Sequence, residues 1–172
     1  MKIVYFGDPV LREECVDVVV NEKTVKIADE MLEALKLYKG FGLAGPQVGI
    51  TKKIVVIRFN EEEEPLYVFN LKFLEHSQEQ NLMEEGCLSL PGIWEKVVRP
   101  EKVRVSYQDR NGEEHVETLD GLEARVFQHE GDHLYGKLFI DHISLIKRKL
   151  LKKKLDKIRK GIILEEFLPE SK

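Results

Sequence analysis

The chain has 172 residues, of which 42% are hydrophobic and 34% charged, and its formal net charge is −4. This balance predicts one globular domain over residues 1–172 and excludes disordered and fibrous proteins. The mild negative charge argues against a DNA partner, and the apolar runs are too short to span a membrane. With two cysteines and no signal-like N-terminal pattern, we expect a cytoplasmic protein.

The first half of the chain contains one clear helical period and two short apolar runs. Apolar residues at helical spacing predict a helix over 25–38, with Asn21 or Thr24 as its N-cap. The glycines that follow are typical of a helix end. Runs rich in β-branched residues predict strands over 54–59 and 66–69.

A hairpin is predicted further along. Apolar and polar residues alternate over 103–108, which indicates a strand that is wet on one face. Asn111 and Gly112 favour a type I′ turn, in which both central residues have positive φ. The returning strand is expected over 114–119.

Two helices are predicted after this hairpin. Asp120 and Glu123 match a capping box, and the helix that they open should close at Gly136. A last, basic helix is expected over 144–160, followed by a short tail. The fold class is therefore α+β, with small antiparallel or mixed sheets around a central metal-binding helix, and with one helix on either side in sequence.

The central helix carries the motif His129-Glu130-Gly131-Asp132-His133. Residues four apart on a helix share a face, so both imidazoles can reach one ion. Glu130 would lie beside that ion without binding it, where a proton carrier is needed. The alternative is two exposed histidines that have this spacing by chance.

Two histidines rarely hold a catalytic ion alone, so a third ligand is needed. Phe139 stands where one known extension of this motif has a histidine, which excludes that solution. Glu165 and Glu166 fall in an apparent tail. Asp141 and His142 are nearer, but nothing in their surroundings directs them to the site.

Cys87 is the better candidate, in the segment Glu85-Gly86-Cys87-Leu88-Ser89. A thiolate binds borderline metals strongly, and the flanking glycine lets the backbone approach a ligand closely. A lone cysteine is more often a small buried apolar residue, and Cys15 is interpreted in that way.

Three segments together resemble the peptide deformylase family. They are Gly-Phe-Gly-Leu-Ala-Gly-Pro-Gln at 40–47, Glu-Gly-Cys-Leu-Ser at 85–89, and Gln-His-Glu-Gly-Asp-His at 128–133. Their order and spacing match the family's three motifs, and the likeness extends over nearly the whole chain. One position departs: Gly45 replaces the family's usual second alanine, which is expected to loosen packing near Gln47 without removing a chemical group.

The resemblance implies that Cys87, His129 and His133 hold Fe(II), for which zinc or nickel can substitute. Its substrate would be a nascent peptide that begins with N-formylmethionine, and formate would be released. In this mechanism a metal-bound water attacks the formyl carbon, while Glu130 acts first as general base and then as general acid. The oxyanion would be stabilised by the Leu88 N–H and the Gln47 amide.

Substrate contacts follow from the same motifs. Backbone groups near the glycines could bind the peptide as an added strand, and the methionine side chain needs an apolar pocket. The expected substrate-binding residues are Phe41, Gly42, Gly86 and Leu122; the alternative for Phe41 and Leu122 is packing in the core. Val126 is assigned to the core instead.

The basic helix has two interpretations. Its apolar stripe, formed by Leu150, Leu151, Leu155 and Ile158, most often means packing on the domain with lysines in water. The alternative is docking on ribosomal RNA, which would be strongly salt-dependent.

Two rival functions remain at this point. A metalloprotease shares the histidine pair, but it lacks its downstream ligand here. A binding module with a structural metal would not need Glu130 and Gln47. Formate release from a formylated peptide distinguishes all three.

Overall fold

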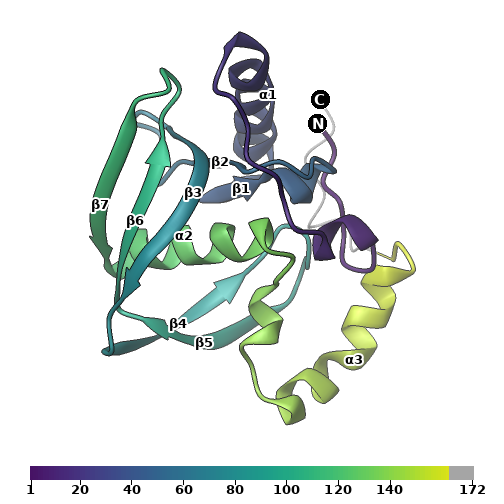
Figure 1. Cartoon of the computed structure of the whole chain (residues 1–172). Coiled ribbons are helices and arrows are strands. Elements are labelled where there is room, and N and C mark those ends of the chain that lie inside the picture. The colour runs from purple at the N-terminus through teal and green to yellow at the C-terminus, as the bar shows by residue number, and fades with distance from the viewer. Residues whose placement is uncertain (163–172) are drawn as a thin grey trace.

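The computed structural model describes residues 1–162 (Figure 1). The predicted tail, with Glu165 and Glu166, lies outside this range. The helices of the described chain are α1 (Glu22–Tyr38), α2 (Gly121–Leu134) and α3 (Leu145–Arg159). Its strands are β1 (Gly42–Ala44), β2 (Ile54–Ile57), β3 (Leu66–His76), β4 (Gln80–Gly86), β5 (Trp94–Pro100), β6 (Lys102–Gln108) and β7 (Glu114–Asp120).

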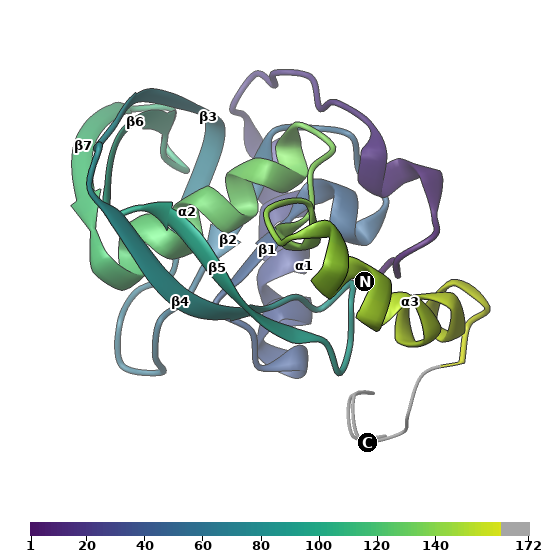
Figure 2. The same ribbon diagram turned by 90° about the horizontal axis from the view of Figure 1, so that it is seen from below.

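Two antiparallel sheets enclose the central helix. The larger sheet has the strand order β1-β2-β3-β6-β7, and β4 pairs with β5 in a separate hairpin. Helix α2 lies between the large sheet and this hairpin, while α1 covers the other face of the large sheet (Figure 1). Figure 2 shows the hairpin crossing α2, with α3 standing to one side. The α+β prediction is confirmed, and both sheets are antiparallel.

Strand β2 is buried on both faces. Successive side chains of a strand point to opposite sides. Ile54 and Val56 therefore pack in the cluster that includes α1, whereas Val55 and Ile57 pack in the cluster that includes α2. This double burial explains why the run is apolar throughout instead of alternating.

The first helix begins as predicted and ends differently. The Asn21 side chain accepts hydrogen bonds from the amides of Lys23 and Thr24, which caps the helix. At the other end the left-handed residue is Lys39, with φ of 56°, and not a glycine. Gly40 is closely packed instead: a Cβ there would lie 3.0 Å from the Leu35 side chain and 3.1 Å from that of Leu88.

Two expected local motifs are wrong in detail. The turn between β6 and β7 spans five residues, and only Gly112 has a positive φ, so it is not a type I′ turn. The Asp109 side chain accepts from the amides of Asn111 and Glu113 and shapes the loop instead. Asp120 precedes α2 but makes no capping hydrogen bond, because it is still paired in β7 and the chain reverses at Gly121.

The third helix packs through a narrower stripe than expected. Leu151, Leu155 and Ile158 are buried against the segment after α2, as an amphipathic helix requires. Leu150 was expected in this stripe, but it is exposed. No helix within residues 1–162 is long and apolar enough to cross a membrane.

Candidate metal centre

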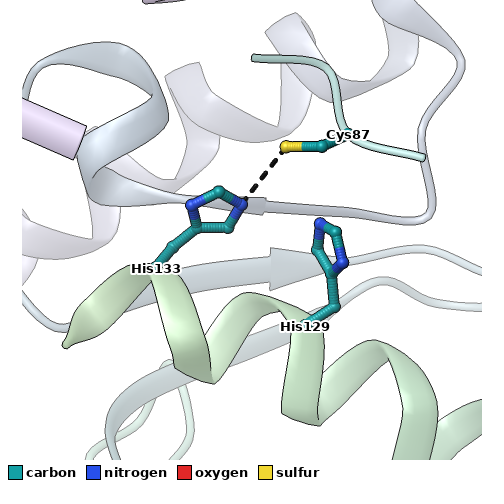
Figure 3. A group of neighbouring side chains, drawn as sticks. All are labelled: Cys87, His129 and His133. Atoms are coloured by element: carbon teal, nitrogen blue, oxygen red, sulfur yellow. Dashed lines mark hydrogen bonds between the residues drawn. The ribbon is translucent and has the colours of Figure 1, made fainter. Parts of the chain in front are cut away.

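Three possible ligands converge between α2 and the end of β4. His129 and His133 project from one face of α2, and Cys87 reaches them from the loop that follows β4 (Figure 3). One donor atom of each residue lies within 4.8 Å of the other two, and the Cys87 Sγ is 3.3 Å from the His133 Nε2. The predicted ligand set is thus brought together.

This arrangement fits a divalent ion. Sulfur and nitrogen ligands bind zinc at about 2.3 and 2.0–2.1 Å, so a tetrahedral ion would hold a sulfur and a nitrogen about 3.5 Å apart. The 3.3 Å between the Cys87 Sγ and the His133 Nε2 is close to this separation. The His129 Nδ1 lies 2.8 Å from the Glu85 carboxylate, to which it donates, and this leaves Nε2 for the ion. A histidine oriented by a carboxylate is the usual form of a metal ligand.

Neighbouring imidazoles lower the pKa of the Cys87 thiol. Burial opposes its ionisation, but the imidazoles of His133 and His129 outweigh burial and lower its pKa to about 5. Cys87 is therefore a thiolate at neutral pH, which is the form that binds metals. Cys15 differs, because burial raises its pKa to about 11.

Glu130 lies beside the ligands in a closed environment. Its side chain belongs to a residue only 3% exposed, and within the described chain its Oε2 has no hydrogen-bond partner. Burial raises the pKa of this carboxyl group. A Cβ on Gly42 would collide with the Glu130 carboxylate, so the glycine permits this close approach.

Gln47 is buried and held in one orientation. Its Oε1 accepts a hydrogen bond of 2.7 Å from the Ala44 amide, and its Nε2 lies 3.4 Å from the Cys87 Sγ, to which it donates. The Ala44 amide can only donate, so the amide group of Gln47 must present its N–H bonds to the metal centre.

The expectation that Gly45 loosens the packing is wrong. A Cβ on Gly45 would lie 2.6 Å from the Ile50 carbonyl oxygen and 2.7 Å from that of Lys52. These are backbone atoms and cannot rotate away. We expect Gly45→Ala to lower the free energy of unfolding by about 1–3 kcal/mol, because overpacking forces a backbone shift. Denaturant unfolding checks this; a more stable variant would contradict it.

A buried ionic network supports the centre from behind and was not predicted. Glu85 accepts two hydrogen bonds from Arg99 and one from Arg125, in addition to that from His129. Arg99 also donates to Asp132, at 2.7 Å. These bonds hold the pKa of Glu85 far below its usual range despite burial. Each charge in the network has a partner, as buried charges require.

The remaining predicted residues differ in burial. Leu88 is partly buried beside α1, and Gly86 ends β4 next to Cys87. Phe41 and Leu122 are 51% and 47% exposed, so both are accessible to a ligand. Val126 is buried in the core that includes α2, as expected.

Comparison with known proteins identifies the family. The family model described as polypeptide deformylase matches residues 1–149. The chain belongs to this family. Peptide deformylase of Thermotoga maritima is 44% identical over 162 residues, which cover 94% of this chain and 98% of that protein. The Pseudomonas aeruginosa enzyme is 42% identical over 159 residues, covering 91% and 95%.

Solved structures of the family agree with the fold. A peptide deformylase from Plasmodium falciparum superposes with a TM-score of 0.88 at 38% identity and covers 93% of this chain and 96% of its own. The crystal structure of the Thermotoga maritima enzyme gives 0.79 at 44% identity, covering 83% and 97%. The chain is accordingly a hydrolase of protein biosynthesis, and its donor set supports a divalent metal.

The assignment of Cys87 as a ligand makes a prediction. Cys87→Ser should reduce the bound metal to a small fraction of one ion per chain, because a neutral hydroxyl replaces a thiolate. Elemental analysis after gel filtration checks this result. Cys15→Ser is the matched control and should keep its metal; unchanged metal in Cys87→Ser would contradict the assignment.

Proposed function

We propose that this chain removes the formyl group from the N-terminal formylmethionine of newly made polypeptides, with Cys87, His129 and His133 as its metal ligands. The observation that carries the proposal is the convergence of these three donors beside the buried Glu130 carboxylate. An ion in this place polarises a carbonyl group and lowers the pKa of water.

The chain's own residues supply the proton transfers. Glu130 is buried next to the ligands, and its raised pKa suits a group that must first accept a proton and later release it. The proton from water would be held on its unpartnered Oε2. It would then pass to the nitrogen of the leaving methionine, which departs as a neutral amine.

The negative charge that develops on the formyl oxygen needs donors in place. The Gln47 Nε2 faces the centre and is locked by the Ala44 amide. The Leu88 backbone N–H, next to Cys87, is the second proposed donor. Losing one such donor typically costs about 10²–10³-fold in rate.

The peptide would bind along backbone edges. We assign Gly42 and Gly86 to backbone contacts, and Phe41 and Leu122 to the methionine side chain. The assay is release of the free amino terminus, with formate, from formyl-Met-Ala-Ser by the metal-loaded protein; the control is release of the free amino terminus from acetyl-Met-Ala-Ser. Release only from the formyl peptide supports the proposal. Release from neither, or cleavage of the peptide backbone, would overturn it.

The native ion is proposed to be Fe(II), in a cytoplasmic enzyme. A thiolate with two imidazoles accepts iron, zinc or nickel. Elemental analysis of protein purified without oxygen should find iron near one ion per chain. Finding zinc in place of iron would contradict the proposed metal, and the proposed deformylation reaction would still stand.

Helix α3 is proposed to dock on ribosomal RNA. Its buried stripe packs on the domain, and its many lysines and arginines face water, with Asp156 as its only acidic residue. This docking would bring the enzyme to its substrate.

Docking through phosphates predicts salt sensitivity. The protein should co-sediment with ribosomes at low salt and be released as salt rises, because each neutralised phosphate adds about −0.7 to −0.9 to the slope of log K against log salt. Reversing Lys152–Lys154 to glutamate should abolish binding. The matched control reverses three exposed lysines of α1, namely Lys23, Lys26 and Lys36. Ribosome binding that does not weaken as the salt concentration rises would refute the proposed docking.

A further inference from the structure

Two strands with a free edge lie beside the candidate metal centre. Within the described chain, β1 pairs only with β2, and β4 pairs only with β5, so each has a free edge. Gly42 of β1 touches Glu130, and β4 leads directly into Cys87. A free edge accepts an extended peptide as a further strand. The inference below rests on the proposed function, in which the substrate takes this place.

The residue opposite Gly86 in the β4–β5 hairpin is Trp94. Its six-membered ring lies flat against Gly86, where a Cβ would meet ring carbons at 2.7–2.8 Å. Trp94 is nevertheless 63% exposed, an unusual state for so large an apolar side chain. The indole thus covers the backbone beside Cys87 and still presents much of its surface to solvent.

The geometry of a β-sheet determines which side chain of a bound peptide would contact the Trp94 ring. Residues directly beside one another in neighbouring strands point to the same face. Trp94 and Gly86 share the face that points away from α2, since Glu85 points toward α2 and neighbours alternate. A peptide residue lying beside Gly86 would direct its side chain to the Trp94 face. In the proposed function the methionine side chain lies against Leu122 of α2, on the opposite face, so the residue beside Gly86 would be the next residue of the peptide.

We propose that Trp94 contacts the side chain of the second residue of the substrate and favours a large apolar residue there. The absence of a side chain at Gly86 lets the indole extend across β4 toward its free edge. Trp94 would touch the substrate away from the reacting atoms and therefore affect selectivity more than chemistry.

Kinetics on two formylated peptides test this contact. Trp94→Ala should lower kcat/KM for formyl-Met-Leu-Ser by about 5–10-fold, the scale of one partly buried leucine side chain. For formyl-Met-Gly-Ser the change should stay below about twofold. Trp94→Phe should retain most of the preference. Val98→Ala removes another exposed apolar side chain from β5 and is the matched control.

The chain has a single tryptophan, which gives a second measurement. Titration with Met-Leu-Ser should shift the emission of the metal-loaded protein to shorter wavelength, and Met-Gly-Ser should shift it less. An equal kinetic loss on both peptides, with lowered metal content, would mean that Trp94 only covers Gly86. No loss on either would also overturn the proposal. If the wild-type protein releases no formate at all, the proposed function fails instead.

Discussion

Glu130→Gln is expected to keep its metal and lose turnover by about 10²–10⁴-fold, the usual contribution of a positioned acid or base. Glutamine has nearly the shape of glutamate, so the contact with Gly42 is preserved. It cannot hold the proton that the reaction transfers. Formate release and elemental analysis on the same sample separate chemistry from metal binding.

The control for this variant is Glu84→Gln, at an exposed position of β4 close to the site in sequence. It should have wild-type activity. Full turnover in Glu130→Gln would refute the proton-transfer role. Loss of the ion from that variant would mean that Glu130 contributes to binding the metal.

Arg99→Met is expected to lower the free energy of unfolding by about 3–5 kcal/mol, because it leaves the buried carboxylates of Glu85 and Asp132 without one of their ion-pair partners. Arg99 and Glu85 are both almost fully buried, and Asp132 pairs with both Arg99 and His142. Methionine keeps much of the apolar volume, so the loss measures the missing charge. Denaturant unfolding in the metal-free protein is the measurement.

Arg104→Met is the matched control. Arg104 pairs with Glu75 at 2.9 Å on the surface, and such pairs contribute about 0–1 kcal/mol. An equally small effect of Arg99→Met would show that the buried network is not stabilising.

The same network determines the response to acid. The folded state lowers the pKa of Glu85 from its ordinary value of 4.5, although burial works in the opposite direction. A carboxyl group with a lowered pKa stabilises the fold fully above its unfolded value and loses that effect as the pH falls through its folded value. The difference in stability between wild type and Arg99→Met should therefore narrow below about pH 4.5.

The sequence predicted the central helix and its two candidate histidine ligands because their spacing is local. His129 and His133 are four residues apart, and that spacing alone places both rings on one face. Cys87 could be added because a thiolate and a glycine occur together in a recognisable motif. The roles given to Glu130, Gln47 and Leu88 stay predictions, which the proposed assays address.

Strands β4 and β5 were not predicted, because charged side chains lie on their buried face and apolar side chains on their exposed face. Their inward residues include the charged Glu85 and Arg99, while Leu82, Trp94 and Val98 point outward and are exposed. Strand patterns assume apolar residues inside. Here the buried Glu85 orients His129 and therefore needs the charge of Arg99 beside it. Glu85 and Arg99 are 14 residues apart, so a local sequence pattern does not show that they pair.

The position of Gly45 was misjudged for a similar reason. Its environment is made by the carbonyl groups of Ile50 and Lys52, which return to it through the loop before β2. A motif comparison shows which side chain is missing and does not show what occupies its place.

Strand β2 packs in two hydrophobic clusters, and this double packing couples the unfolding of the two layers. The layer with α1 and the layer with α2 share Ile54–Ile57 as a common wall. If either layer unfolded alone, one side of these four apolar residues would be exposed to water, which opposes separate unfolding. Heating should therefore unfold α1 and α2 in a single cooperative step.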